Sequence, residues 1–168
     1  MKLSTKGRYG LRALIDLAQH SEKDAVSISS IALRQNISES YLEQLVAKLK
    51  KAGLVVSIRG AQGGYRLAKP AQTISVGDIL RALEGDLRAV ECPALTPQGC
   101  QESQLCVAKY VWQKINESIA ITVDEIMLDQ LVEESRNCLL YTSMGRLEVP
   151  CRLHMGSRRA TRSAAPWK

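Results

Sequence analysis

Three cysteines in the middle of the chain are the residues best suited to chemistry. Cys92, Cys100 and Cys106 are separated by seven and by five residues, in a stretch that also holds prolines and glycine. Thiolates are the ligands that soft metals and iron–sulfur clusters take in proteins. The pattern therefore favours a bound metal or cluster. The alternatives are three thiols without a ligand, or a structural zinc, which would want a fourth protein ligand in a closed site.

The thiols lie on a predicted loop between two helices. Apolar residues at helical spacing end at Gly85 and resume at about residue 106, so residues 86–105 contain little that could be buried. A loop of this length in a compact domain is usually functional or mobile. The preceding helix, residues 75–84, turns four apolar side chains inward: Val76, Ile79, Leu80 and Leu83.

Two further helices are predicted after the loop. The first, at about 106–119, carries apolar residues at steps of four: Val107, Val111, Ile115 and Ile119. A long apolar stripe on a late helix is typical of packing against a second copy of the chain. Thr122 and Glu125 then have the spacing of a capping box, which predicts that a last helix starts there. Its apolar residues are Ile126, Leu128, Leu131 and Val132.

The first seventy residues predict three short helices. Residues 6–20 and about 29–34 show helical periodicity, and Asn36 suits a turn because asparagine tolerates left-handed backbone. Ser38 is a natural N-cap for the third helix, which Gly53 ends. The buried stripe of the third helix consists of Leu42, Leu45, Val46 and Leu49.

The opposite face of the third helix has short polar groups first and lysines last. It carries Ser40, Glu43, Gln44, Lys48 and Lys51. This order suits a helix whose first turns meet base edges in DNA while its end meets phosphates. The alternative is an ordinary amphipathic surface helix.

A β-hairpin follows the third helix. Residues 54–59 have strand character, glycines at 60, 63 and 64 supply a turn, and residues 65–67 begin a return strand. Helices followed by such a hairpin predict a winged helix-turn-helix. Arg59 lies where the hairpin tip begins, so it could enter a minor groove, or it is a solvated turn arginine. The glycines do not form a P-loop, which would need a Gly-Lys-Ser/Thr ending and a following helix.

The charge of the chain, +6 in total, is unevenly distributed. Residues 1–70 hold 12 Lys/Arg and 5 Asp/Glu, whereas residues 71–137 hold 5 and 11. A basic first part favours a polyanionic partner such as double-stranded DNA, although it can also be a solvated surface.

The last stretch, residues 138–168, has a different texture. It is Arg-rich and begins with Cys-Leu-Leu-Tyr-Thr-Ser, which a common sequencing-library adapter encodes when it is read through in one frame. It also lacks helical or strand periodicity. We therefore expect it to be a non-native tail; the alternative is a genuine basic tail that adds nonspecific affinity for DNA.

These observations predict a mainly α fold with a small β-hairpin wing. A winged helix-turn-helix DNA-binding domain is expected over residues 1–70. The loop that holds the thiols and a long C-terminal dimerisation helix are expected over residues 71–137.

Residues 1–137 resemble the IscR-like iron–sulfur cluster regulators, which belong with NsrR and CymR to a family of small winged-helix repressors. The matching stretches are residues 6–9, 40–45, 53–55 and 59–65, and the three cysteines fall where that family places its cluster ligands. The resemblance implies a homodimer whose third helices read adjacent major grooves. It implies base contacts from Ser40, Glu43 and Gln44, and a phosphate or groove contact from Tyr41 and Arg59. The implied cofactor is an iron–sulfur cluster of the 2Fe-2S type on Cys92, Cys100 and Cys106.

One position departs from that family. The IscR-like proteins use a histidine three residues after the third cysteine, where this chain has Lys109, normally a protonated and poor ligand. The NsrR-like alternative, a carboxylate near the start of the partner chain, meets Arg8. The histidines, His20 and His154, lie on the first helix and in the tail. The fourth ligand stays open among Glu91, Glu102, a small thiol and water.

We therefore expect a cytoplasmic transcription regulator that senses an iron–sulfur cluster and controls cluster assembly or related stress genes. The alternative is a cluster-free regulator of cysteine or sulfur metabolism that acts through a partner protein or a metabolite. An enzyme or electron carrier could use the same thiols, but no base, nucleophile pair or cofactor loop accompanies them. No apolar run of 18 residues predicts a membrane span, and the first residues lack the apolar core of a signal peptide.

Overall fold

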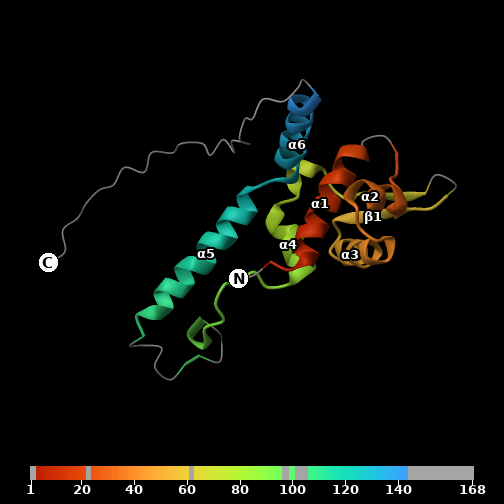
Figure 1. Cartoon of the computed structure of the whole chain (residues 1–168). Coiled ribbons are helices and arrows are strands. Elements are labelled where there is room, and N and C mark those ends of the chain that lie inside the picture. The colour runs from red at the N-terminus through yellow and green to blue at the C-terminus, as the bar shows by residue number, and fades with distance from the viewer. Residues whose placement is uncertain (1–2, 22–23, 61–62, 96–98, 101–105, 144–168) are drawn as a thin grey trace.

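The first three helices form where the sequence predicts them. In the computed structural model, which describes residues 3–21, 24–60, 63–95, 99–100 and 106–143, they are α1 (Thr5–His20), α2 (Ile28–Gln35) and α3 (Glu39–Lys51) (Figure 1). Asn36 ends α2 with left-handed backbone, at φ 52°. Gly53, at φ 71°, follows the end of α3. Ser38 occupies the predicted N-cap position, but its side chain makes no capping hydrogen bond.

One hydrophobic core joins these helices to the rest of the fold. It includes Leu14 and Leu17 of α1, the whole predicted stripe of α3, and residues from far along the chain. Leu128 and Val132 near the end of the chain are buried in the same cluster. The helix-turn-helix therefore depends for part of its core on the last helix.

The wing is a two-stranded antiparallel sheet of β1 (Val55–Ile58) and β2 (Gly64–Leu67). Val26, between α1 and α2, extends it with two backbone hydrogen bonds to Tyr65, of 2.8 and 2.9 Å. Gly64 is required at this crossing, because a Cβ there would lie 2.5 Å from the Val26 carbonyl oxygen. The hairpin is thus attached to the helical body through the start of β2, close to the turn.

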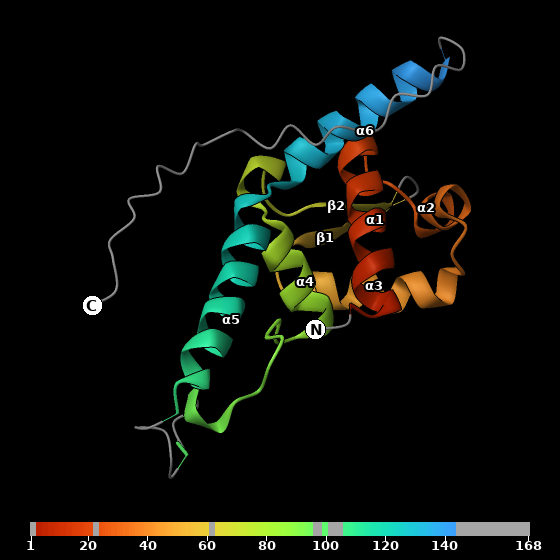
Figure 2. The ribbon, with the colours of Figure 1, turned by 60° about the vertical axis from the view of Figure 1, so that its left-hand side comes forward.

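Helix α4 (Val76–Glu84) follows a short 3-10 turn, η1 (Ala71–Thr73), and packs across α1 (Figure 2). Ser75 and Asp78 form a capping box at its start. The four side chains predicted to face inward from this helix are all buried. At α1, Gly10 allows the close approach, because a Cβ there would lie 2.3 Å from a methyl carbon of Leu83.

The junction between the last two helices differs from the prediction. Helix α5 (Ala108–Glu125) continues through Thr122, whose hydroxyl donates to the Ser118 carbonyl at 2.7 Å, so the predicted capping box is wrong. Helix α6 (Leu128–Ser143) starts later, and the Gln130 side chain accepts from the Met127 backbone N–H.

Long-range hydrogen bonds stabilise the break between α5 and α6. Val76 N donates to the Ile126 carbonyl at 2.8 Å, and Leu128 N donates to the Ile74 carbonyl at 2.9 Å. The chain therefore bends where it meets the start of α4 (Figure 2).

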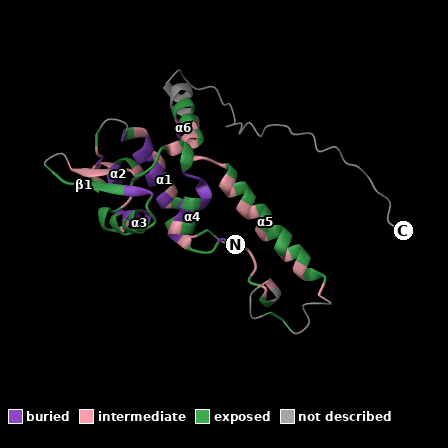
Figure 3. Ribbon diagram, turned by 180° about the vertical axis from the view of Figure 1, so that it is seen from behind, coloured by how far each residue is buried: buried purple, intermediate pink, exposed green. Residues whose placement is uncertain are grey.

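Helix α5 packs on α4 along one side and extends beyond the helical body, and α6 lies against α1 (Figures 1 and 2). None of the residues of α5 is buried, which Figure 3 shows as a ribbon without purple along its whole length. Helix α6 extends six residues into the segment expected to lack periodicity, because it ends at Ser143. The remainder of the expected tail, residues 144–168, lies outside the described residues.

Candidate DNA-binding surface and cysteine loop

The exposed face of α3 presents the polar residues that the sequence singles out. Ser40, Glu43, Gln44 and Lys48 are all exposed, and the apolar stripe behind them is buried. Their spacing of three and four residues places them on one side of the helix. The structure therefore brings these four residues together on one accessible surface.

Tyr41 lies at the edge of this surface and is half-buried. Its hydroxyl donates to Thr5 Oγ1 at 3.3 Å, and its ring meets that of Tyr9 edge to face, with centroids 6.2 Å apart. These contacts orient the start of α3 against the start of α1.

Lys48 connects α3 with α4. Its Nζ donates to the Leu83 carbonyl at 3.0 Å, an oxygen in the last turn of α4 that has no partner within the helix. An ammonium group has three donors, so Lys48 keeps further donors for an anion outside the protein.

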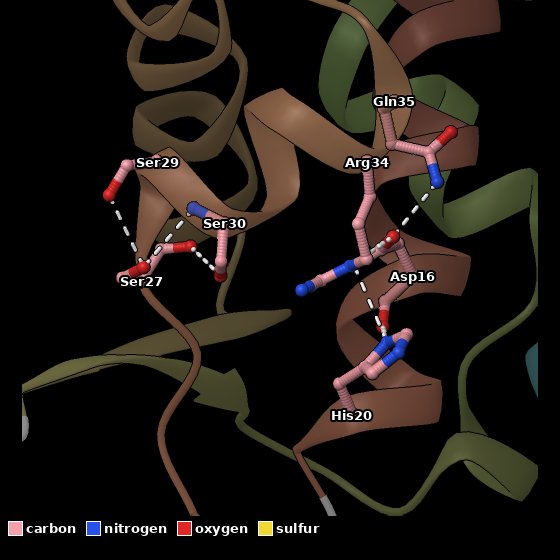
Figure 4. A network of polar contacts seen from close by, with 7 residues as sticks. All are labelled: Asp16, His20, Ser27, Ser29, Ser30, Arg34 and Gln35. Atoms are coloured by element: carbon pink, nitrogen blue, oxygen red, sulfur yellow. Dashed lines mark hydrogen bonds and ion pairs between the residues drawn. The ribbon is translucent and has the colours of Figure 1, made fainter.

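An ion pair between the exposed Arg34 and the buried carboxylate of Asp16 fixes α2 against α1 (Figure 4). Asp16, 2% exposed, accepts from Arg34 through both carboxylate oxygens, at 2.6 to 3.1 Å, and from Gln35 Nε2 at 2.9 Å. The hydrogen bond to Asp16 raises the pKa of Arg34 further above its usual value. His20 is engaged at the same place, where its Nδ1 lies 2.8 Å from the Asp16 carbonyl oxygen. This network sets the angle between the first two helices, against which α3 is placed.

Arg59 follows β1 directly and is exposed, as are Val56 and Ile58 on the strand before it. The wing is held to α3 by a hydrogen bond of 2.8 Å from Lys50 Nζ to Ser57 Oγ. The structure therefore places Arg59 on an accessible part of the hairpin, two residues after the Ser57 that α3 holds.

Glu84 binds the start of α1 to the end of α4. Its Oε1 accepts from Ser4 N at 3.1 Å, from Ser4 Oγ at 2.6 Å and from Gly7 N at 2.8 Å. Partial burial acts to raise the pKa of Glu84, but these hydrogen bonds outweigh it and the pKa lies below its ordinary value. The carboxylate also suits its position at the positive end of the α1 dipole.

The cysteine loop begins beside this contact. Cys92 and Cys106 are half-buried, Cys100 is exposed, and all three thiols are free. The loop is less irregular than the sequence predicts, because η2 (Pro93–Leu95) follows Cys92 and contacts α5. Leu87, on the segment that leads to Cys92, is buried against α4. Within the described residues no three Cys, His, Asp or Glu side chains converge into a metal-binding group.

Asn116, in the middle of α5, holds the segment before Cys92. Its Oδ1 accepts from the backbone of Ala89 at 2.9 Å and of Val90 at 3.5 Å, and its Nδ2 donates to the Val90 carbonyl at 3.2 Å. Sequence analysis missed this residue, as it missed Glu84 and Asp16, because an isolated polar residue in a helix carries no signal of its distant partner.

Of the protein residues considered for the fourth ligand, the structure describes Glu91 but not Glu102. Lys109 is half-buried, with Nζ 5.1 Å from the centroid of the Tyr110 ring. Glu91 is exposed, while Glu102 and His154 lie outside the described residues. The last histidine, His20, belongs to the Asp16 network on α1.

Comparison with known proteins identifies the family. Over residues 3–134 the sequence matches the Rrf2 family, described as iron-dependent transcriptional regulators. The chain belongs to the Rrf2 family. It is therefore a transcriptional regulator, and its winged-helix fold is the one predicted from sequence.

Relatives named IscR and relatives named CymR both resemble this chain. IscR of Vibrio vulnificus is 42% identical over 135 residues, which is 80% of this chain and 79% of the relative. The structure of T. potens IscR is 46% identical, covers 82% of this chain and 90% of its own, and superposes with a TM-score of 0.66. CymR, the global cysteine regulator of B. subtilis, is 41% identical over 79% of this chain and 97% of its own, also with a TM-score of 0.66.

The Rrf2 assignment agrees with the expectation of a regulator rather than an enzyme. The family match stops at residue 134, four residues before the segment expected to be non-native. In the part of the chain that the structure describes, no helix is long and apolar enough to cross a lipid bilayer.

Proposed function

We propose that this regulator binds specific DNA sites as a homodimer and that a 2Fe-2S cluster on Cys92, Cys100 and Cys106 changes its affinity for them. The observation that carries the proposal is the pairing of an exposed polar face on α3 with three free thiols on the segment leading into α5. The exposed face of α3 would read the DNA sequence, and the three thiols would bind the cluster that is sensed.

Base edges are read by the first turns of α3. We assign this role to Ser40, Glu43 and Gln44, which are exposed together on one face. A glutamine amide can pair with adenine, and a carboxylate can accept from the amino group of cytosine.

The DNA backbone and the minor groove are contacted around these residues. We assign backbone contacts to Tyr41 and Lys48, and a minor-groove contact to Arg59 on the wing. Lys48 carries out this role while it also bonds to Leu83, which ties the phosphate contact to α4.

The partner of α5 is a second copy of the same helix. Val107, Tyr110 and Val111 are 75%, 62% and 51% exposed, and Ile115 and Ile121 are also exposed on this helix. Burying one such side chain contributes roughly 1.5–3 kcal/mol, so a helix pair of this kind supplies a substantial part of a dimer interface. The dimer would place two α3 helices on one side of the DNA, as half-sites one turn apart require.

The donor set of the loop fits a cluster in its chemistry. Three thiolates are the ligands such a cluster takes, and when bound it would supply a redox-active and labile centre. The chain's own part is to order the loop: η2 and the contact with Asn116 already hold the Cys92 end on α5. Because Lys109 replaces a good ligand, the fourth ligand is weak and we expect the cluster to exchange readily.

The test is anaerobic reconstitution of the full chain, with iron and acid-labile sulfide counted per protomer. Each of the three thiols is changed to serine in turn, and Cys138→Ser with Cys151→Ser serves as the matched control outside the site. We expect loss of bound iron for each of the three and full loading for the control. Unchanged iron and sulfide in a variant that lacks all three thiols would refute the assignment of the ligands.

DNA affinity is then measured with and without the cluster, on a site selected from a random library. We expect a difference in Kd of at least about tenfold for the specific site and little for random DNA. Equal affinities of the two forms on every selected site would remove the sensing role while leaving the cluster in place.

The second candidate is a cluster-free regulator of cysteine or sulfur metabolism. It is favoured by the similarity to CymR, called a global cysteine regulator, and by Lys109 at the fourth position. A colourless protein after anaerobic purification and reconstitution, with intact specific DNA binding, would select this alternative.

A further inference from the structure

Asn116 is bonded to the backbone as a neighbouring peptide group would be. It accepts from two N–H groups and donates to one carbonyl, all within Ala89 and Val90, at 2.9, 3.5 and 3.2 Å. A side-chain amide has the donor and acceptor that such pairing needs, whereas a carboxylate has acceptors only. The contact is partly buried and joins positions 26 and 27 residues apart in the sequence.

The contact lies on the side of α5 that faces α4. Val123, two turns later on α5, packs against the cluster of Val76, Leu80 and Leu87. Residues seven apart share a face of a helix, so Asn116 continues the same interface. Leu87 of that cluster is two residues before Ala89. After α4 ends, the chain is therefore buried at Leu87 and then contacts Asn116 through Ala89.

The contact also fixes the position of the first thiol. Cys92 comes two residues after Val90, and its carbonyl accepts from Leu95 N at 2.9 Å within η2, which contacts α5. Cys106 comes two residues before α5 begins. Both flanks of the cysteine segment are therefore anchored on one helix, one at its start and the other about 12 Å further along its axis.

We propose that Asn116 is a positioning residue that holds Cys92 in register with Cys106 on α5. This inference rests on the proposed function for what the thiols bind, but the anchoring itself does not. Without the amide, the segment from Leu87 to Cys92 would be free to leave α5. Ordering of the loop would then no longer affect the middle of that helix.

The test begins with the cluster-free full chain, by hydrogen exchange. In Asn116→Leu, which has nearly the same volume and no hydrogen-bonding group, the amides of Ala89 and Val90 should exchange about tenfold faster or more, because local opening no longer breaks any bond to the side chain. The matched control is Gln113→Leu, one turn earlier, whose amide donates to Glu117 at 2.8 Å and does not contact Ala89 or Val90. It should leave these amides unchanged.

Asn116→Asp serves as a second variant if the leucine variant folds poorly. It keeps the acceptor and loses the donor to the Val90 carbonyl, so exchange at Val90 and Ala89 should lie between wild type and Asn116→Leu. Exchange rates equal to wild type in both folded Asn116 variants would overturn the anchoring.

The positioning role is read on the reconstituted protein as the rate at which a chelator removes iron. We expect Asn116→Leu to lose iron at least about fivefold faster than wild type and Gln113→Leu to match wild type. Faster amide exchange with unchanged iron loss would overturn the positioning role. If wild type binds no iron at all, the proposed function fails, and the exchange data still decide whether Asn116 anchors the loop.

Discussion

Glu84 and Lys48 hold the last turn of α4 between the first helix and the third. Glu84 accepts three hydrogen bonds from the start of α1, and Lys48 donates to the carbonyl of Leu83. Gly85 follows immediately and begins the path to the cysteine loop. Lys48 therefore connects the end of α4 with α3, the helix that we propose binds DNA, and Glu84 connects it with α1.

The lowered pKa of Glu84 makes part of the stability depend on pH. The carboxylate stabilises the folded state fully above its unfolded pKa of about 4.5, and this contribution is lost as the pH falls through the lower folded pKa. Glu84→Gln should cost about 1 kcal/mol at pH 7 and less at pH 3, since only the charged form makes the stronger bonds. Urea unfolding at both pH values measures this, with the exposed Glu125→Gln as control. A constant difference between wild type and Glu84→Gln across this range would contradict the assignment.

On α3, the exposed polar residues should differ in what they read. Gln44→Ala should relax base preference at one position, at a cost on the order of 1–3 kcal/mol. Glu43→Ala should broaden the set of tolerated sites without abolishing binding, because the carboxylate disfavours some bases as well as accepting a hydrogen bond from cytosine. Lys48→Ala should weaken all sequences about equally. Selection from a site library measures all three, and unchanged preferences for both Gln44 and Glu43 variants would exclude α3 from the reading role.

The accessible face of α3 could be predicted from sequence because it follows from periodicity within one helix. The same holds for Asn36, whose left-handed turn is a property of the residue itself. The partners of Asp16, Glu84 and Asn116 could not be predicted in this way. Each lies on an element whose approach is decided by packing of the whole chain.

Among the elements, α5 has two unlike sides. One packs on the α4 cluster and holds the cysteine segment, and the other exposes apolar side chains. An ordering of the loop therefore acts on the same helix that we propose as the dimer interface.

Charges on the exposed side of α5 should separate the dimer. Val111→Glu with Ile115→Glu should give a monomer that binds DNA weakly, because each buried residue is worth roughly 1.5–3 kcal/mol in the dimer. The control is Gln113→Glu, an exposed polar position between them. Analytical ultracentrifugation measures the mass, and a double variant that still sediments as a dimer would move the interface elsewhere.

Helix boundaries were predictable where a local cap or a glycine defines them, as at Gly53 and Gly85. They were not predictable at the end of α5. Thr122 and Glu125 form a capping pattern in sequence, but the break occurs after Glu125, where Ile126 and Leu128 bond to the backbone beside α4. These long-range backbone hydrogen bonds, rather than the local capping pattern, determine where α5 ends.

For the molecule as a whole, the charge is concentrated where DNA would lie. The basic first 70 residues form the helix-turn-helix and wing, and the acidic residues 71–137 form α4, the cysteine segment, α5 and the first part of α6. The dimer would thus join two basic units through acidic segments, which keeps the attraction to phosphate on one side.

Binding to DNA should accordingly fall steeply with salt. Each phosphate contact contributes a slope of about −0.9 in log K against log salt, and half-sites should lie about one helical turn apart. Fluorescence anisotropy over a salt series, with half-site spacing varied by five base pairs, measures both. Similar affinity for random and selected duplexes at moderate salt would refute specificity.

Removal of the last residues should leave the regulator functional. A chain truncated after Asn137 keeps Leu128 and Val132 in the core, so we expect unchanged stability and specific affinity. Binding to random DNA should fall if residues 138–168 act as a basic tail and stay unchanged if they are foreign to the protein. Sequencing of the locus across codon 137 separates the two origins, and a continuous native reading frame would make the tail genuine.

The return of α6 to the core has a consequence for how the protein is made. Leu128 and Val132 complete the cluster that surrounds Leu14 and Leu17, so the helix-turn-helix lacks part of its interior until α6 has been synthesised. A nascent chain that has only just emerged past the wing therefore cannot yet hold α3 in place. Ribosome-bound intermediates that lack α6 would expose apolar surface and would gain affinity for DNA only once this helix has joined the core.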